Sequence, residues 1–165
     1  PRFCVSIAFE ENGELKCGVI YDPVMKEEFL TEKGRGAYLN GKRLRVSQTQ
    51  DLKQSLLVTG FPYDLENPKT NNVPYFLHFL RKAQAIRRDG SAALNLAYTA
   101  AGRFDGFWEL GLSPWDTAVG ILLIREAGGV VCTMDGQHAS VEDHALIAGP
   151  PIIAAALTQE CRSVS

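Results

Sequence analysis

The fold is decided by residues 90–129, GSAALNLAYTAAGRFDGFWELGLSPWDTAVGILLIREAGG. Gly90 forms a turn that opens an apolar, helix-like run, and the aromatic strand that follows ends near Glu109. A proline turn then brings Asp116 to the start of a second helix, which stops at the glycine pair 128–129. Two helix N-termini and two carboxylates are thus close in sequence, which predicts a site for a metal-bound anion such as phosphate.

Strands and helices also alternate on both sides of this stretch. The segment 63–72 is polar and rich in turn formers, and we expect a surface loop there. The hydrophobic pattern predicts strands at 55–59, 83–86, 104–109, 129–133 and 145–148, and helices at 73–82, 91–101, 115–127 and 151–161. Such alternation is typical of a layered α/β unit.

The beginning of the chain follows a different pattern. Large apolar residues alternate with smaller or polar ones, as in a half-buried strand: Phe3, Val5, Ile7 and Phe9. Asn-Gly pairs at 12–13 and 40–41 are strong hairpin signals. We therefore expect an antiparallel β-meander over residues 3–46, while Asp22-Pro23 indicates a turn rather than a metal motif.

These patterns together predict an α+β fold, an antiparallel meander followed by an α/β half. The expected division assigns residues 1–50 to an antiparallel-sheet subdomain and residues 51–165 to an α/β subdomain. Because Pro1-Arg2 leads at once into a strand, with no initiating Met, we also expect an N-terminal portion that is missing here.

Composition narrows the classes of function. The 165 residues carry a net charge of −2, which argues against a nucleic-acid partner, and no apolar run approaches the ~20 residues that cross a bilayer. The four cysteines are widely spaced and the three histidines form no ligand pattern, so we expect buried, reduced thiols and no histidine metal site. His138 and His144 lie in a polar loop, where we expect them at the solvated surface, and the cytoplasm is the expected location.

Each candidate site residue also has an ordinary structural interpretation. Asp116 could simply cap its helix, which is a common role for Asp. Glu109 could be a surface residue at a strand end, although ligands of α/β sheets gather at such ends. The Gly90-Ser91 turn could accept a phosphate at a helix start, but such turns are common. Of Arg87 and Arg88, which alternation sends to opposite faces, we expect at least one to be solvated.

Five motifs nevertheless occur together: Trp115-Asp116-Thr117-Ala118, Glu126-Ala127-Gly128-Gly129, Gly90-Ser91-Ala92-Ala93, Asp105-Gly106-Phe107-Trp108-Glu109 and Gly18-Val19-Ile20-Tyr21-Asp22-Pro23. With this spacing the chain resembles the inositol monophosphatase family, whose members are magnesium-dependent, lithium-sensitive phosphatases, and it is most similar to the bacterial branch. The resemblance covers essentially the whole chain and implies the layered αβαβα sugar-phosphatase fold.

The resemblance also implies roles. Asp116 would ligate a catalytic Mg²⁺ and lie close to a small phosphomonoester substrate, Gly90, Ser91 and Ala92 would line the substrate pocket, and Glu109 would accept hydrogen bonds from ring hydroxyls. Mg²⁺-activated water would attack phosphorus without a covalent intermediate. The family commonly forms homodimers.

One departure from the family pattern is large. The first metal-binding signature, Asp-Pro-x-Asp-Gly-Thr/Ser, and an earlier Glu-Glu pair are both absent from the sequence. Asp116 alone should hold Mg²⁺ poorly, so we expect the complete protein to be a phosphatase and these residues alone to have little or no activity. Inositol monophosphate is the favoured substrate over fructose 1,6-bisphosphate or 3′-phosphoadenosine 5′-phosphate. The alternative is a non-catalytic fragment or a protein-binding module with the phosphatase fold.

Overall fold

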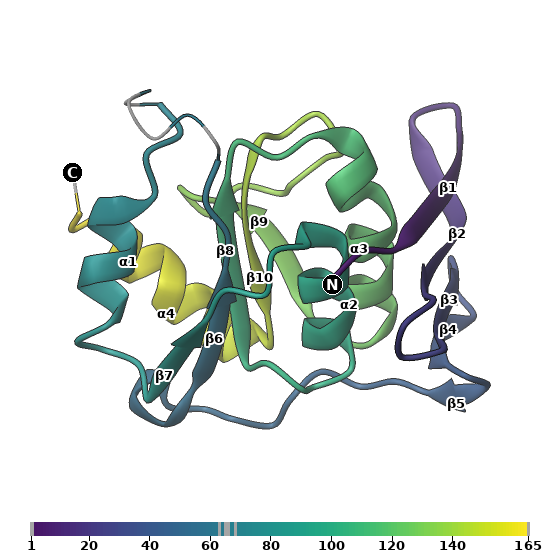
Figure 1. The fold of residues 1–165 in the computed structure, drawn as a ribbon, viewed down its shortest axis with the longest axis horizontal. Helices are drawn as coiled ribbons and strands as arrows, with labels where there is room; N and C mark the ends of the chain where they lie inside the picture. Colours follow the sequence, from purple (N-terminus) through teal and green to yellow (C-terminus); the bar gives the residue numbers. More distant parts are fainter. Residues whose placement is uncertain (1, 63, 65–66, 68, 165) are drawn as a thin grey trace.

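Two β-sheets enclose a pair of helices, and a second pair of helices covers the far side of the second sheet (Figure 1). The structure, a computed structural model, describes residues 2–62, 64, 67 and 69–164. Across the molecule the layers run strand, helix, strand, helix, and the apolar core fills the spaces between them. The expected sugar-phosphatase fold class is confirmed, with the antiparallel sheet first in the chain and the α/β half after it.

The first sheet is the predicted meander. It pairs its strands antiparallel in chain order: β1 Val5–Glu11, β2 Glu14–Asp22, β3 Glu27–Glu32, β4 Gly36–Leu39 and β5 Lys42–Arg43. Both Asn-Gly hairpins are confirmed, because Asn12 and Gly13 have φ of 54° and 74° and Asn40 and Gly41 have φ of 47° and 78°, the left-handed values that such turns require.

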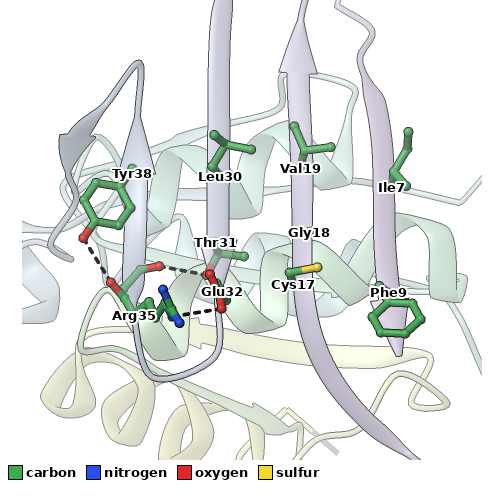
Figure 2. Close-up of a pocket in the computed structure, with 11 residues that line it drawn as sticks. Ile7, Phe9, Cys17, Gly18, Val19, Leu30, Thr31, Glu32, Arg35 and Tyr38 are labelled. Atoms are coloured by element: carbon green, nitrogen blue, oxygen red, sulfur yellow. Dashed lines mark hydrogen bonds and ion pairs between the residues drawn. The ribbon is translucent and has the colours of Figure 1, made fainter. Parts of the chain in front are cut away.

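The outer face of this sheet is apolar and open (Figure 2). Ile7 pairs with Val19, Val19 with Leu30 and Leu30 with Tyr38, so these four side chains form one row across four strands. We call this row and the neighbouring Phe9 the open face. The strand expected at the start of the chain is confirmed, but its alternating apolar side is not half-buried, since Ile7 is 60% and Phe9 55% exposed.

The inner face of the same sheet is close-packed. A Cβ on Gly18 would lie 2.9 Å from a methyl carbon of Val119, so only glycine lets helix α3 (Pro114–Glu126) approach β2 this closely. Phe29 packs edge-on against Tyr98 at 5.8 Å between ring centroids, an arrangement that adds about 0.5–1.5 kcal/mol to the burial itself.

The second sheet is mixed and has the order β7-β6-β8-β10-β9. Its strands are β6 Leu56–Thr59, β7 Ala85–Arg87, β8 Gly106–Leu110, β9 Val130–Thr133 and β10 Ala145–Gly149. β6 runs parallel to both β7 and β8, whereas β10 runs antiparallel to β8 and β9. The carboxyl ends of β6 and β8 therefore open at the same edge of the sheet.

Helices α2 (Ala92–Ala100) and α3 lie between the sheets, and α1 (Val73–Phe79) and α4 (Pro151–Cys161) cover the far side of the second sheet (Figure 1). The inner helices are apolar on most sides because both of their faces are buried. Gly120 permits their contact, since a Cβ there would lie 2.5 Å from Leu96 Cβ.

Several predicted boundaries were wrong by a few residues. The helix expected over 73–82 ends at Phe79, and the strand expected at 83–86 occupies 85–87. The last meander strand ends at Arg43; Leu44 and Val46 continue as a connection whose side chains are buried. The loop expected over 63–72 lies partly outside the described residues.

Asp22 holds the turn that follows β2, as the sequence indicated. It is buried, and its Oδ1 accepts hydrogen bonds from the amides of Val24 (2.8 Å) and Met25 (2.9 Å). Residues 44–55 then run from the first sheet to the second, and the division into subdomains at residue 50 stays a prediction. In the described part of the chain no helix has both the length and the apolar character to cross a membrane.

Candidate functional site

A cavity of about 420 Å³ opens where the carboxyl ends of β6 and β8 meet the N-termini of α2 and α3. Its walls include every residue that the sequence nominated for the site: Gly90, Ser91, Ala92, Glu109 and Asp116. The structure thus brings together side chains from two helix starts and a strand end. The volume lies within the range typical of small-molecule pockets.

The α2 wall is the start of a capped helix. Gly90 has φ of +88°, which an L side chain rarely adopts, and this turn directs the chain into the helix. Ser91 is the N-cap, and its Oγ accepts a hydrogen bond from the amide of Leu94 at 3.4 Å. The first N–H groups of a helix lack partners within it and carry a partial positive charge, so this wall favours an anion.

Asp116 is the third residue of α3, and Ser113 is its N-cap. Asp116 Oδ2 accepts a hydrogen bond from the Ser113 amide at 3.1 Å, which is the reciprocal half of a capping box. In the described part of the chain Oδ1 makes no hydrogen bond, and the residue lines the cavity. The carboxylate therefore secures its helix with one oxygen while the other stays available to a ligand.

Glu109 lies deep in the cavity, on β8. Its Oε2 is buried and has no hydrogen-bond partner among the described residues. Burial, followed by repulsion from Asp116, raises the pKa of Glu109 from 4.5 to about 8, although Arg88 opposes the shift. Near neutral pH Glu109 is therefore largely a neutral acid that can donate as well as accept a hydrogen bond.

Two arginines, Arg2 and Arg88, also line the cavity. The Arg88 guanidinium lies 5.3 Å from the centroid of the Phe61 ring, and both residues line the cavity. Arg2 also lines it and donates to the Tyr98 hydroxyl at 2.9 Å. Arg87 is exposed and does not line the cavity, which agrees with the prediction that at least one residue of the Arg87–Arg88 pair is solvated.

Sequence reasoning missed several lining residues. Gly60 and Phe61 directly follow β6, and their position after a buried strand was a usable signal because such ends hold ligands. Asn95 is 1% exposed in an otherwise apolar run, and a lone amide in a buried helix was a second signal. Arg2 gave no local signal, since its place depends on the packing of the chain's first residues against α2.

The cysteines and histidines do not enlarge the site. All four cysteines are free thiols, as expected, but the prediction that they are buried was wrong for Cys17, which is exposed, and for Cys4, which is only partly buried. His138 and His144 are exposed, in agreement with the sequence, and His78 bonds to Glu160 at 2.6 Å on the surface.

The residues described do not by themselves fit a Mg²⁺ ion. They contain no group of three or more Asp, Glu, His or Cys side chains placed to hold a metal. Asp116 offers one unbonded carboxylate oxygen, and Glu109 is largely protonated near neutral pH. Mg²⁺ requires near-octahedral oxygen coordination, so further ligands would have to come from elsewhere.

The amino-acid sequence matches the inositol monophosphatase family over residues 1–165. Nus factor SuhB of Pseudomonas aeruginosa is 48% identical over 153 residues, and the inositol-1-monophosphatase of Mesorhizobium japonicum is 46% identical over 157 residues. These matches cover 90% and 95% of this chain but only 56% and 59% of the two relatives. The chain thus spans less than two thirds of their length.

Solved structures match in the same way. The inositol monophosphatase of Anabaena (Nostoc) sp. PCC 7120 superposes on the whole chain with a TM-score of 0.95 at 43% identity, and 66% of that protein is covered. The extragenic suppressor protein suhB of Bartonella henselae gives a TM-score of 0.92 at 41% identity, with 98% of this chain and 62% of that protein covered.

Proposed function

The chain belongs to the inositol monophosphatase family, and we propose that it forms the substrate-binding part of a metal-dependent phosphomonoesterase. The observation that carries the proposal is that one cavity is lined by the α2 N-terminus, by Arg2 and Arg88, and by the carboxyl groups of Asp116 and Glu109. The helix start and the arginines suit a phosphate, and the Asp116 carboxylate suits a cation.

Each wall has a role in binding. The amides at Gly90, Ser91 and Ala92 would receive the phosphate, because a helix start offers unpaired N–H groups. Asp116 would be one ligand of a Mg²⁺ ion through Oδ1, whereas Glu109 would hydrogen-bond a hydroxyl of the alcohol. The remaining metal ligands would come from residues other than those that the structure describes.

Inositol monophosphate is the proposed substrate. Glu109 and Asn95 give the cavity polar groups beyond those that a phosphate needs, which suits a polyol. A relative at 46% identity is named inositol-1-monophosphatase. Fructose 1,6-bisphosphate and 3′-phosphoadenosine 5′-phosphate are the competing substrates. With the substrate we also propose a cytoplasmic homodimer whose activity is inhibited by lithium.

The test compares two lengths of protein. The protein at its full natural length should release phosphate from myo-inositol 1-phosphate in the presence of Mg²⁺, and residues 1–165 alone should release little. Turnover of the nucleotide alone would overturn the substrate assignment. Normal turnover by residues 1–165 alone would overturn the need for further metal ligands.

A protein-binding module is the second candidate, and the open face favours it. Ile7, Leu30 and Phe9 expose a continuous apolar surface on the first sheet (Figure 2), and such surfaces mark contacts with other polypeptides. Relatives at 44–48% identity are named Nus factor SuhB. A mass near 18 kDa for the protein isolated from its own cells, with no phosphatase activity, would favour this candidate.

A further inference from the structure

Every unpartnered buried side-chain atom identified in the described part of the chain lies in one cavity. There are three such atoms: Asn95 Nδ2, Asn95 Oδ1 and Glu109 Oε2. A buried polar atom without a partner costs about 1–3 kcal/mol, so folded proteins rarely leave one unsatisfied. That all three gather in the same cavity indicates a bound group that satisfies them.

Asn95 is exceptional within its own helix. The other polar side chains of α2 are bonded: the Tyr98 hydroxyl donates to Asp22 Oδ2 at 3.2 Å, and Thr99 Oγ1 donates to the Asn95 carbonyl at 2.8 Å. Only the Asn95 amide is buried without a bond among the described residues of this helix. A structural role in packing would be served better by an apolar residue, because an unsatisfied amide weakens the fold.

We propose that Asn95 binds a hydroxyl group of the ligand and thereby selects polyol phosphates over phosphates of simple alcohols. This inference rests on the proposed function. Asn95 lies four residues after the N-cap Ser91, on the same face of α2 and about one turn, or ~6 Å, deeper. The Asn95 amide thus belongs to the cavity lining one turn from the helix start, where a hydroxyl of a bound ligand can reach it.

The chemistry of the amide selects a hydroxyl. Nδ2 only donates and Oδ1 only accepts, whereas a hydroxyl does both. A phosphate oxygen accepts, so it would satisfy Nδ2 and leave Oδ1 unpaired. Glu109, which holds the third unpaired atom, can hydrogen-bond a second hydroxyl in the same cavity.

The experiment uses two ligands that differ only in ring hydroxyls. The protein at its full natural length is titrated calorimetrically, without divalent metal, with myo-inositol 1-phosphate and with cyclohexyl phosphate. We expect the wild type to prefer the inositol ester. Asn95→Leu should weaken its binding about tenfold, the effect of roughly one hydrogen bond, and leave cyclohexyl phosphate unchanged. Gln48→Leu, which removes an exposed amide outside the cavity, should change neither affinity.

The outcomes separate the two proposals. If the wild type prefers the inositol ester but Asn95→Leu keeps the same preference, the role of Asn95 is overturned and the proposed function stands. The role of Asn95 is also overturned if Asn95→Leu lowers the affinity for both ligands equally. It is likewise overturned if the variant lowers only the melting temperature, because the Asn95 amide would then be hydrogen-bonded within the protein itself. If the wild type binds both ligands equally, the substrate class fails together with the inference. If it binds neither without divalent metal, the inference is overturned, because the helix start and Asn95 then do not hold the ligand, and the proposed function stands. If Asn95→Leu does not fold, the two affinities are measured for Asn95→Ala and compared in the same way.

Discussion

Gly60 and the carboxylate of Glu109 lie so close that a Cβ on Gly60 would come 2.1 Å from Glu109 Oε1. Gly60 follows β6 and Glu109 lies on the parallel neighbour β8, so a missing side chain on one strand makes room for a carboxylate on the next. The burial that raises the pKa of Glu109 depends on that space.

Gly60→Ala should therefore displace Glu109. Because the clash is with the end of a flexible side chain, we expect the fold to survive with a loss of about 1 kcal/mol in the free energy of unfolding, while affinity for myo-inositol 1-phosphate falls about tenfold. Calorimetry and urea denaturation measure the two effects. When Glu109→Ala is already present, Gly60→Ala should cause no further loss of affinity for myo-inositol 1-phosphate. If the two substitutions instead lower the affinity additively, Gly60→Ala does not act by displacing Glu109.

The stability of the fold should depend on Glu109 and pH. Its pKa is about 8 when folded, against 4.5 in the unfolded chain, so the folded state keeps the proton over a range in which the unfolded state has released it. The stability that Glu109 contributes is therefore fully present below about pH 4.5 and is lost as the pH rises to about 8, by several kcal/mol at most.

Urea denaturation across this range tests the pH effect. Glu109→Gln should flatten the decline relative to the wild type, because Gln does not titrate. Glu28→Gln, an exposed residue on β3, is the matched control and should leave the decline intact. Identical pH profiles for wild type and Glu109→Gln would show that Glu109 ionises normally.

Asp116→Asn should separate catalysis from folding. Asn Oδ1 can still accept the bond from the Ser113 amide, so the free energy of unfolding should change by less than about 1 kcal/mol. Loss of an anionic metal ligand should lower turnover by the full-length protein at least ~100-fold. Phosphate release and thermal unfolding are the measurements; unfolding of the variant would instead support a purely capping role.

Two buried asparagines should respond in opposite ways. Asn72 is fully bonded, with Nδ2 donating to Thr59 Oγ1 and Gly60 O and Oδ1 accepting from Trp108 Nε1 at 2.7 Å. Asn72→Leu should destabilise the fold by about 2–3 kcal/mol, whereas Asn95→Leu should be neutral or stabilising without ligand. Urea denaturation measures both. Equal losses would show that the Asn95 amide is bonded in the unliganded protein.

The open face should control self-association of residues 1–165. Ile7→Lys places a charge at the β1 end of the apolar row and should lower the weight-average mass in sedimentation at high concentration. Val24→Lys, in an exposed turn outside the row, serves as the control and should leave the mass unchanged. A monomeric wild type at all concentrations would show that this surface does not attract a second copy.

Most of the architecture was readable from the sequence because local signals agreed with the tertiary fold. Asn-Gly turns, two-residue periodicity and glycine or proline boundaries each fix the backbone locally, and these features placed both sheets. The errors fall where tertiary contacts decide. Val46 had a strand pattern, but its amide donates a hydrogen bond to the Ala127 carbonyl, at the end of a distant helix.

The site was predicted only in part. Gly90, Asp116 and Glu109 lie at a turn, a helix start and a strand end that local sequence patterns predict, and all three line the cavity. Arg2 reaches it through packing of the chain's first residues against α2, which no periodicity encodes. The exposure of Ile7 and Phe9 was likewise unpredictable, since alternation marks which side chains share a face but not what covers that face.

Asp116 belongs both to the cavity and to the first turn of α3, so ligand binding should affect how often that turn opens. Asp116 Oδ2 accepts the hydrogen bond of the Ser113 amide in the first turn, and the residue lines the cavity. A cation held at Oδ1 would also restrain fraying of that turn, so hydrogen exchange at the Ser113 amide should slow as the site fills. The opening turn of this helix thus becomes a reporter of binding that needs no substrate turnover.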